Sequence, residues 1–258
     1  MLQFQLKKIA EDCSKKVQMA NEESLFFEEP FKHVVIDDFF PRDFAKLLID
    51  NFPDINSSVW EKTNDKDIEI KLRTMWKSEF DIPDGIIEAI RIFNSSLFLN
   101  SMSSLFGIQK IMPDPYFSGG GLNVTVSGGL LDIHVDGNYH DASGLNRRLN
   151  AILYLNPEWQ EGWGGEFGLY DSTGDNLVKK VAPIHNRLVI FDTNDYSFHG
   201  LPDPLNFPDD KVRKSIILYY YTKESRPSSQ VAFEKPHSAL WKKKGLRDKK
   251  GNINRDFI

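Results

Sequence analysis

The stretch LDIHVD, residues 131–136, alternates apolar and polar side chains, which is the period of a β-strand with one buried face. Similar short stretches flank it along the chain, each bounded by residues that favour turns. They lie at residues 122–126, 148–156, 165–170, 178–181, 187–191 and 215–221, with one more expected at His199. About eight short strands in roughly 110 residues predict a mainly β domain with supporting helices, rolled into a double-sheet jelly roll.

Before this region, residues 30–40 are predicted to form a strand that enters a turn at Pro41, and two helices are predicted after it. An amphipathic helix is predicted to begin at Asp43 and to run to about Phe52, with its apolar side chains on one face. A second helix is predicted from about Asp84 to Phe98, because its apolar positions recur at intervals of three and four. We expect this helix to back the sheet.

The length of 258 residues fits one large domain with a helical preface. We expect a polar, helical extension at residues 1–28 and a domain at residues 29–225, whose core spans residues 115–222. A basic tail should follow at residues 226–258. Trp241 in this tail is surrounded by lysines, and a solvated terminal face is the expected structure there.

Charge and cysteine content exclude several classes of function. The net charge is −5 and no broad basic surface is evident, so nucleic acid is not an expected partner. Cys13 is the single cysteine, which rules out an intrachain disulfide and fits a reducing compartment. The N-terminus lacks the apolar core of a signal peptide, and no stretch approaches the ~18 apolar residues of a membrane span. We therefore predict a cytoplasmic protein with no membrane partner, and its oligomeric state is left open.

Three side chains have the pattern of a metal site. His134 and Asp136 lie two apart in one predicted strand, so both point to the same face. His199 lies on a later strand that can return beside them. Two imidazoles and one carboxylate can occupy one face of an Fe(II) ion and leave its other positions open. Arg213 opens the last strand, and its guanidinium can pair with a carboxylate through two hydrogen bonds, whereas Lys214 should point to the opposite face.

The ordered set His134-x-Asp136, His199 and Arg213 resembles the Fe(II)/2-oxoglutarate-dependent dioxygenases, and most of all their prolyl 4-hydroxylase-like group. Four further stretches carry the resemblance, at residues 147–156, 163–166, 186–191 and 213–221. It covers roughly residues 30 to 225 and is dense from 120 to 222.

The resemblance implies a double-stranded β-helix in which His134, Asp136 and His199 bind iron. It implies that Arg213 binds the C5 carboxylate of 2-oxoglutarate and that Tyr154 donates a hydrogen bond to the same carboxylate. A charge count agrees, since Fe(II), one aspartate and a dianionic 2-oxoglutarate leave one negative charge for a cation to neutralise. The cofactors would be Fe(II), 2-oxoglutarate and O2, with ascorbate as a candidate reductant. An unactivated C–H bond would be hydroxylated, with release of succinate and CO2.

Several alternatives stay open at this point. A prolyl residue in a peptide or protein is the first prediction for the substrate, and a small molecule, sugar or lipid intermediate is the second. A non-catalytic jelly-roll module that binds metal or carbohydrate is the alternative outside the enzymes. Lys214 stays an alternative to Arg213, because the segment after His199 is longer than in the family. The remaining candidates are His140 as a ligand or substrate contact, Asn123 and Asn150 as pocket residues, and Arg187, Trp159 and Trp163 as structural residues.

Overall fold

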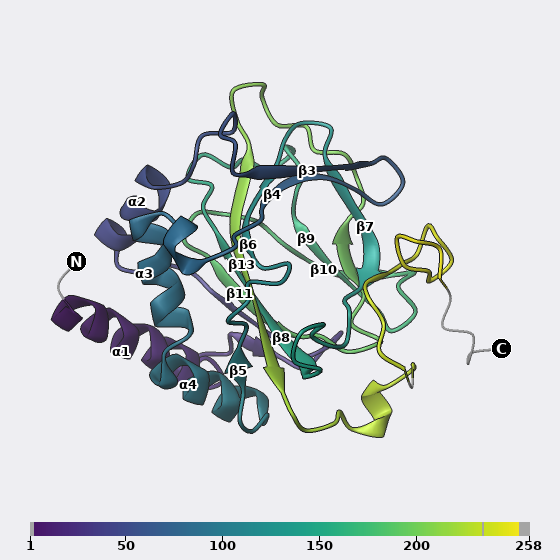
Figure 1. Cartoon of the computed structure of the whole chain (residues 1–258), viewed down its shortest axis with the longest axis horizontal. Coiled ribbons are helices and arrows are strands. Elements are labelled where there is room, and N and C mark those ends of the chain that lie inside the picture. Colours follow the sequence, from purple (N-terminus) through teal and green to yellow (C-terminus); the bar gives the residue numbers. More distant parts are fainter. Residues whose placement is uncertain (1–2, 234, 253–258) are drawn as a thin grey trace.

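The computed structural model describes residues 3–233 and 235–252 (Figure 1). Residues 1–2, 234 and 253–258, which belong to the predicted extension and tail, lie outside the described residues. The helices are α1 (Gln3–Met19), α2 (Arg42–Asp50), α3 (Asp84–Phe93) and α4 (Ser96–Phe106), with short 3-10 turns at Glu79–Asp81 and Ser228–Gln230. The strands are β1 (Phe26–Phe27), β2 (His33–Ile36), β3 (Trp60–Asp65), β4 (Glu69–Thr74), β5 (Met112–Pro113), β6 (Gly121–Thr125), β7 (Leu130–Val135), β8 (Asn146–Tyr154), β9 (Phe167–Tyr170), β10 (Leu177–Val181), β11 (Leu188–Asp192), β12 (His199–Leu201), β13 (Arg213–Thr222) and β14 (Leu240–Trp241).

The strands form one curled antiparallel sheet. Its main path runs β1-β2-β11-β8-β13-β6-β4-β7-β12-β9-β10, while β3, β5 and β14 attach beside β4, β13 and β7. Strands β8, β9 and β11 enclose an inner core in which Ile152, Phe167 and Phe191 pack together. The predicted mainly β jelly roll is confirmed, because the sheet curls around a core of its own apolar side chains.

A larger core lies between the sheet and the helices. The four helices gather on one side of the sheet, and the C-terminal segment lies on the opposite side beside β7 (Figure 1). Leu149 on β8 and Ile190 on β11 share this core with Phe93 and Phe98 of the helices. Cys13 of α1 is fully buried in the same cluster. The predicted division of the chain at residues 28 and 225 stays a prediction, although α1 packs into this common core.

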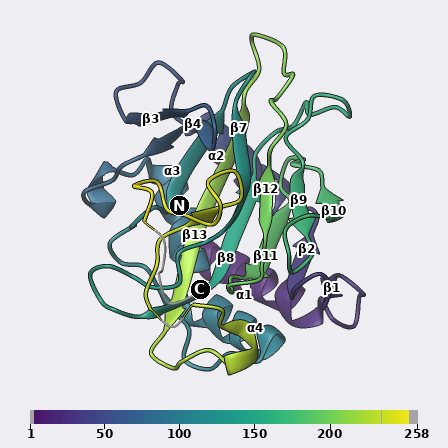
Figure 2. The same cartoon turned by 90° about the vertical axis from the view of Figure 1, so that its right-hand side faces the viewer.

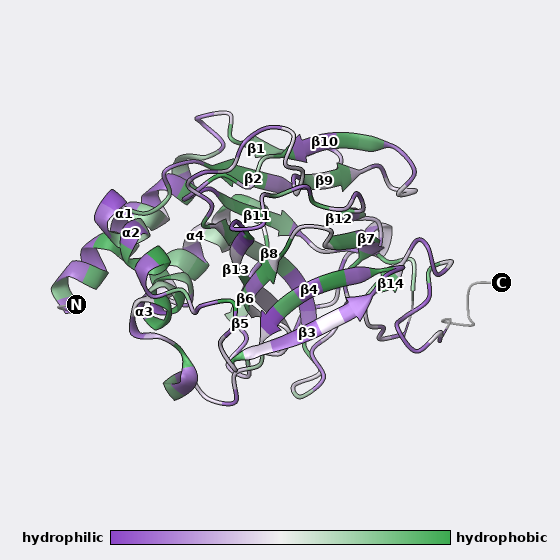
Figure 3. Ribbon diagram, turned by 90° about the horizontal axis from the view of Figure 1, so that it is seen from above, coloured by the Kyte–Doolittle hydropathy of each residue, from purple (hydrophilic) through white to green (hydrophobic). Residues whose placement is uncertain are grey.

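One local prediction needs correction, and one hairpin was not predicted. The helix predicted from Asp84 to Phe98 is two helices, because the chain breaks at Asn94 and restarts with Ser95 as the N-cap of α4, where its hydroxyl accepts from the Phe98 amide at 3.3 Å. The hairpin of β3 and β4 was not predicted. Its outer strand β3 is largely hydrophilic and exposed, so it lacks the alternation that marks a half-buried strand (Figure 3).

No helix within residues 3–233 and 235–252 is long and apolar enough to cross a lipid bilayer. The cytoplasmic location stays a prediction.

Candidate active site

A cavity of about 540 Å³ collects the predicted functional residues. Side chains of β4, β7, β8, β12 and β13 line it, together with part of the C-terminal segment, which lies in front of the sheet in Figure 2. His134, Asp136, His199 and Arg213 all line this cavity, and Tyr154 lies next to Arg213. The structure therefore brings together all five residues that the sequence singled out.

The three predicted iron ligands converge from two neighbouring strands. His134 lies near the end of β7, Asp136 follows that strand directly, and His199 opens β12 opposite His134 in the pairing of the two strands. The Nε2 atom of His134 lies 3.7 Å from Asp136 Oδ1, and the Nε2 atom of His199 lies 3.5 Å from Asp136 Oδ2. One ligand atom from each residue lies within 4.8 Å of the others. The three atoms thus surround one site.

Hydrogen bonds fix which nitrogen of each imidazole faces this site. Nδ1 of His134 lies 2.9 Å from the carbonyl oxygen of Asp132, and Nδ1 of His199 lies 2.8 Å from the carbonyl oxygen of Ser197. A carbonyl only accepts, so each Nδ1 donates its proton there, and each Nε2 is the nitrogen that faces Asp136. Burial and the neighbouring His134 lower the pKa of His199 to about 4, which keeps its imidazole neutral at pH 7. Neutral imidazoles with a second hydrogen bond of this kind are typical metal ligands.

Asp136 contacts Asn150, a predicted pocket residue, and Arg147, which the sequence did not point to. Asn150 donates to its Oδ2 at 2.6 Å, and Arg147 donates to Asn150 at 3.2 Å and lies 3.8 Å from Asp136 Oδ1. Burial acts to raise the pKa of Asp136, but Arg147 and the two histidines outweigh burial and hold it well below its usual value. Arg147 also stacks on the ring of Tyr219 at 3.4 Å. Arg147 alone would bring the charge count to zero, so that count does not single out Arg213.

A second polar group lies on β8 and β13. Arg213 is 6 % exposed, and its Nε donates to the Gly165 carbonyl at 2.8 Å. The hydroxyls of Tyr154 and Ser215 are buried with no hydrogen-bond partner among the described residues. Burial raises the pKa of Tyr154, against the opposing effect of Arg213, so the phenol keeps its proton. One guanidinium beside two unpaired hydroxyls fits an incoming carboxylate.

Strand alternation separates Arg213 from Lys214, as predicted. Lys214 does not line the main cavity; its ammonium lies over the ring of Phe52, 5.1 Å from the centroid. Ser215 lies two residues after Arg213, and this spacing could have identified it from the sequence. Gly165 permits the close approach of Arg213, because it has a φ of 80° and a Cβ there would lie 2.9 Å from Arg213 Cδ.

The other candidates fall into two groups. Asn150 lines the cavity as predicted, whereas Asn123 is buried but does not line it. His140 lines the cavity, yet its Nε2 lies 2.9 Å from Asp114 Oδ1 and its Nδ1 accepts from two backbone amides at 3.1 Å. Both of its nitrogens are therefore occupied, and His140 lies outside the group of ligand atoms. Arg187 pairs with Asp37 at 2.8 Å and is structural. Trp159 and Trp163 pack in an apolar cluster near Leu205.

One residue of the predicted tail contradicts its expected exposure. Trp241 is 2 % exposed and stacks on His134, with ring centroids 4.5 Å apart and planes 25° apart. The solvated face expected there is wrong for this residue, because β14 pairs with β7 and carries the indole over the metal site. A two-residue strand has no periodicity, so the sequence held no signal for it.

Residues 120–221 match the sequence profile of the 2OG-Fe(II) oxygenase superfamily. This match contains the triad, Tyr154 and Arg213. Residues 120–221 therefore resemble a 2OG-Fe(II) oxygenase domain. This match agrees with the predicted Fe(II), 2-oxoglutarate and O2, and it favours an enzyme over a non-catalytic module. Ascorbate stays a prediction.

Curated relatives of the oxygenase domain have names that mention proline. Over 86 residues, or 32% of this chain, it is 35% identical to the prolyl 3-hydroxylase OGFOD1 of Mus musculus and 37% identical to that of Xenopus laevis. The matched segment spans only 15% and 16% of those two proteins. What they act on as whole proteins is therefore a guide to this chain and no more.

Solved structures share the fold. A prolyl hydroxylase from Trichoplax adhaerens, in complex with a hypoxia inducible factor peptide fragment, is 21% identical with a TM-score of 0.54, over 86% of this chain and 94% of the other. A Pseudomonas putida prolyl-4-hydroxylase is 16% identical with a TM-score of 0.57, over 80% and 98% of the two chains. Both likenesses extend well beyond residues 120–221.

Proposed function

We propose that this chain is an Fe(II)- and 2-oxoglutarate-dependent hydroxylase that acts on a prolyl residue in a peptide or protein. The observation that carries the proposal is the convergence of two imidazole Nε2 atoms with the carboxylate of Asp136 in one cavity. Two histidines and one carboxylate suit Fe(II) and leave positions open for a co-substrate and O2. The family assignment and the unpaired hydroxyls near Arg213 support the same reaction.

Each polar group would have a separate role. His134, Asp136 and His199 would hold Fe(II), which when bound supplies the activation of O2. Arg213 would pair with the distal carboxylate of 2-oxoglutarate, and Tyr154 would donate a hydrogen bond to it. In the balanced reaction, substrate, 2-oxoglutarate and O2 give hydroxylated substrate, succinate and CO2, with one oxygen atom in the new hydroxyl and the other in succinate.

The co-substrate region would also need to exclude water. Apolar side chains line the cavity near the polar groups: Ile152, Phe167, Phe191, Leu201 and Ile217. They would contact the methylene groups of 2-oxoglutarate and keep water from the charged pair at Arg213. A pair that is shielded in this way is stronger than the same pair in bulk water. Ser215 would complete the carboxylate site as a third donor.

The proposal of a peptide substrate has more limited support. It rests on the 86-residue match to two prolyl 3-hydroxylases and on polar side chains in the lining of the cavity. These side chains belong to Tyr139, Asp141, Lys71 and Arg73. Arg147 also lines the cavity, and its Nη2 is buried without a hydrogen-bond partner among the described residues. Such a donor would suit a peptide carbonyl.

The proposal is tested by assaying the purified chain with Fe(II), 2-oxoglutarate and O2. We expect slow succinate formation without substrate, and inhibition by N-oxalylglycine, which mimics 2-oxoglutarate but does not lose CO2. A panel of proline-containing peptides should then raise the rate, with a gain of one oxygen on proline by mass spectrometry. An iron-loaded chain that forms no succinate would refute the enzymatic function. Stimulation by small molecules alone would replace the peptide with the second predicted substrate class.

A further inference from the structure

After β13 the chain returns to the cavity through a segment that we call the C-terminal strap, residues 226–233 and 235–249. Five of its residues line the cavity: His237, Ser238, Ala239, Trp241 and Lys249. The strap lies outside the part of the chain that matches the oxygenase family. Its contacts nevertheless concentrate on the segments that carry the three metal-binding side chains.

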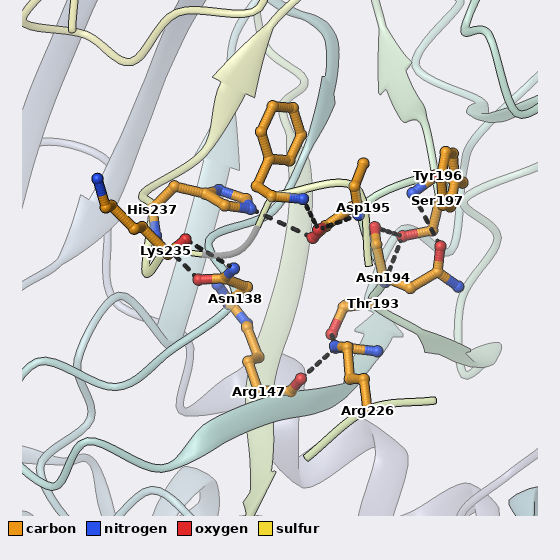
Figure 4. Close-up of polar contacts among 12 residues, drawn as sticks. Asn138, Arg147, Thr193, Asn194, Asp195, Tyr196, Ser197, Arg226, Lys235 and His237 are labelled. Atoms are coloured by element: carbon orange, nitrogen blue, oxygen red, sulfur yellow. Dashed lines mark hydrogen bonds and ion pairs between the residues drawn. The ribbon is translucent and has the colours of Figure 1, made fainter. Parts of the chain in front are cut away.

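The first anchor ties the strap to the loop that precedes His199. Asp195 lies four residues before that histidine and is 3 % exposed. Its Oδ2 accepts from the backbone amides of Ala232 and Phe233 at 2.8 and 2.9 Å, and its Oδ1 lies 3.2 Å from Nε2 of His237 (Figure 4). One carboxylate thus holds the strap at Ala232, Phe233 and His237.

The second anchor ties the strap to the segment that follows Asp136. Asn138 lies two residues after Asp136, and its Oδ1 accepts from the His237 amide at 2.9 Å (Figure 4). Its own amide donates to the His237 carbonyl at 3.1 Å, and its Nδ2 donates to the carbonyl of Lys235 at 3.4 Å. The chain on both sides of His237 is therefore fixed against the residues that place Asp136.

The third anchor is at His134 itself. Trp241 pairs with His134 across β14 and β7, and its indole lies nearly parallel to the imidazole. The backbone amide of Lys243 donates to Asp132 Oδ2 at 2.9 Å. The carbonyl of Asp132 in turn accepts from His134 Nδ1. The strap thus restrains both the plane of the imidazole and the group that orients it.

We propose that the C-terminal strap is the positioning element of the metal centre, and that Trp241 is its main positioning residue for His134. The inference rests on the proposed function, because it takes His134 as an iron ligand. With the indole covering one face, the imidazole loses the stacking contact if it rotates away from the site. Stacked aromatic pairs are worth a few-fold to about tenfold in an equilibrium constant, and partners that orient metal ligands change metal affinity by about 10–100-fold.

The test measures Co(II) binding to the purified full chain by visible absorption, alongside thermal unfolding of the metal-free protein. Trp241→Leu should weaken Co(II) binding about tenfold and change its absorption envelope, whereas Trp241→Phe, which keeps an aromatic ring, should stay within about threefold of wild type. Trp60→Leu is the matched control, because Trp60 stacks on Phe52 with centroids 5.9 Å apart and does not line the cavity. This control should lower Tm and leave Co(II) affinity unchanged.

Unchanged Co(II) affinity in Trp241→Leu would overturn the inference, and so would an equal loss in Trp60→Leu. If Trp241→Leu does not fold, Asn138→Ala decides the matter. We expect Asn138→Ala to weaken Co(II) binding about threefold through the loss of the second anchor. Wild-type affinity in this variant would be contrary to the inference. A wild-type chain that binds no Co(II) would instead overturn the proposed function, and this inference with it.

Discussion

Two histidine–aspartate groups contribute imidazoles to the same cavity but differ in which ring nitrogens are free of hydrogen bonds. In the triad, His134 and His199 each donate from Nδ1 to a carbonyl and turn Nε2 toward Asp136. In the other group, His140 uses Nδ1 to accept two backbone amides and Nε2 to donate to Asp114. The residue types are the same in both groups, and all three imidazoles are buried. The hydrogen bonds decide which group has lone pairs available for a metal.

A fourth histidine extends this comparison. His33 on β2 repeats the ligand pattern, because its Nδ1 lies 2.8 Å from the carbonyl of Phe31, two residues earlier. Its Nε2, however, lies 3.1 Å from the ammonium of Lys179. The same local geometry therefore yields a metal ligand only where a carboxylate, and not a cation, faces the free nitrogen.

The largest expected effect comes from removing a member of the triad. His134→Ala, Asp136→Ala or His199→Ala should abolish succinate formation and reduce Co(II) binding by more than about 100-fold, because each removes one direct ligand. His140→Ala is the matched control and should keep most of the Co(II) affinity. Near-normal turnover in any triad variant would remove that residue from the ligand set.

The next effect concerns the co-substrate. Arg213→Ala should raise the concentration of 2-oxoglutarate needed for half-maximal succinate formation by about 10–100-fold, since hydrogen bonds to charged groups contribute about 1.5–3 kcal/mol. Lys214→Ala should change it less than about twofold, because that side chain faces away from the cavity. If the two variants exchanged these results, the carboxylate-binding role would belong to Lys214.

A smaller effect is expected from the second histidine–aspartate group. Asp114→Ala removes the acceptor of His140 and of the amides of Tyr116 and Ser118. We expect the free energy of unfolding to fall by about 1–3 kcal/mol, because buried donors lose their partner. Co(II) affinity should stay within a few-fold of wild type. A loss as large as that of a triad variant would erase the distinction between the two groups.

The smallest effect is a change in the pH dependence of stability. Burial is the main cause that lowers the pKa of His33 to about 4, from 6.5 in the unfolded chain. Between these values the unfolded state binds more protons, so the free energy of unfolding should fall as the pH drops from 6.5 to 4. His33→Asn should reduce this slope, measured by urea unfolding of the metal-free protein at several pH values. An unaltered slope would show that His33 titrates alike in both states.

Strand alternation made the main parts of the site predictable. It placed His134 and Asp136 on one face and separated Arg213 from Lys214, and both expectations agree with the structure. Arg147 was missed because its importance depends on its distance from Asp136, which no local pattern encodes.

The strap was beyond prediction for a related reason. Trp241 meets His134 through β14, a strand too short to have a period, and lysines around it suggest exposure. The His140–Asp114 pair likewise joins two loops, whose conformations alternation does not describe. Local periodicity therefore identified the faces of strands, and the contacts between non-adjacent segments had to come from the structure.

The direct pairing of His199 with His134 across β12 and β7 has a consequence for evolution. The separation of the two imidazoles is set by the fixed spacing of adjacent strands, and the intervening loops do not contribute to it. Insertions and deletions in loops that do not contact the site would leave this separation unchanged, so homologues can diverge in length between the two histidines. A slip of β12 by a single residue would instead turn His199 to the other face of the sheet, and would disable the site while the rest of the barrel survived.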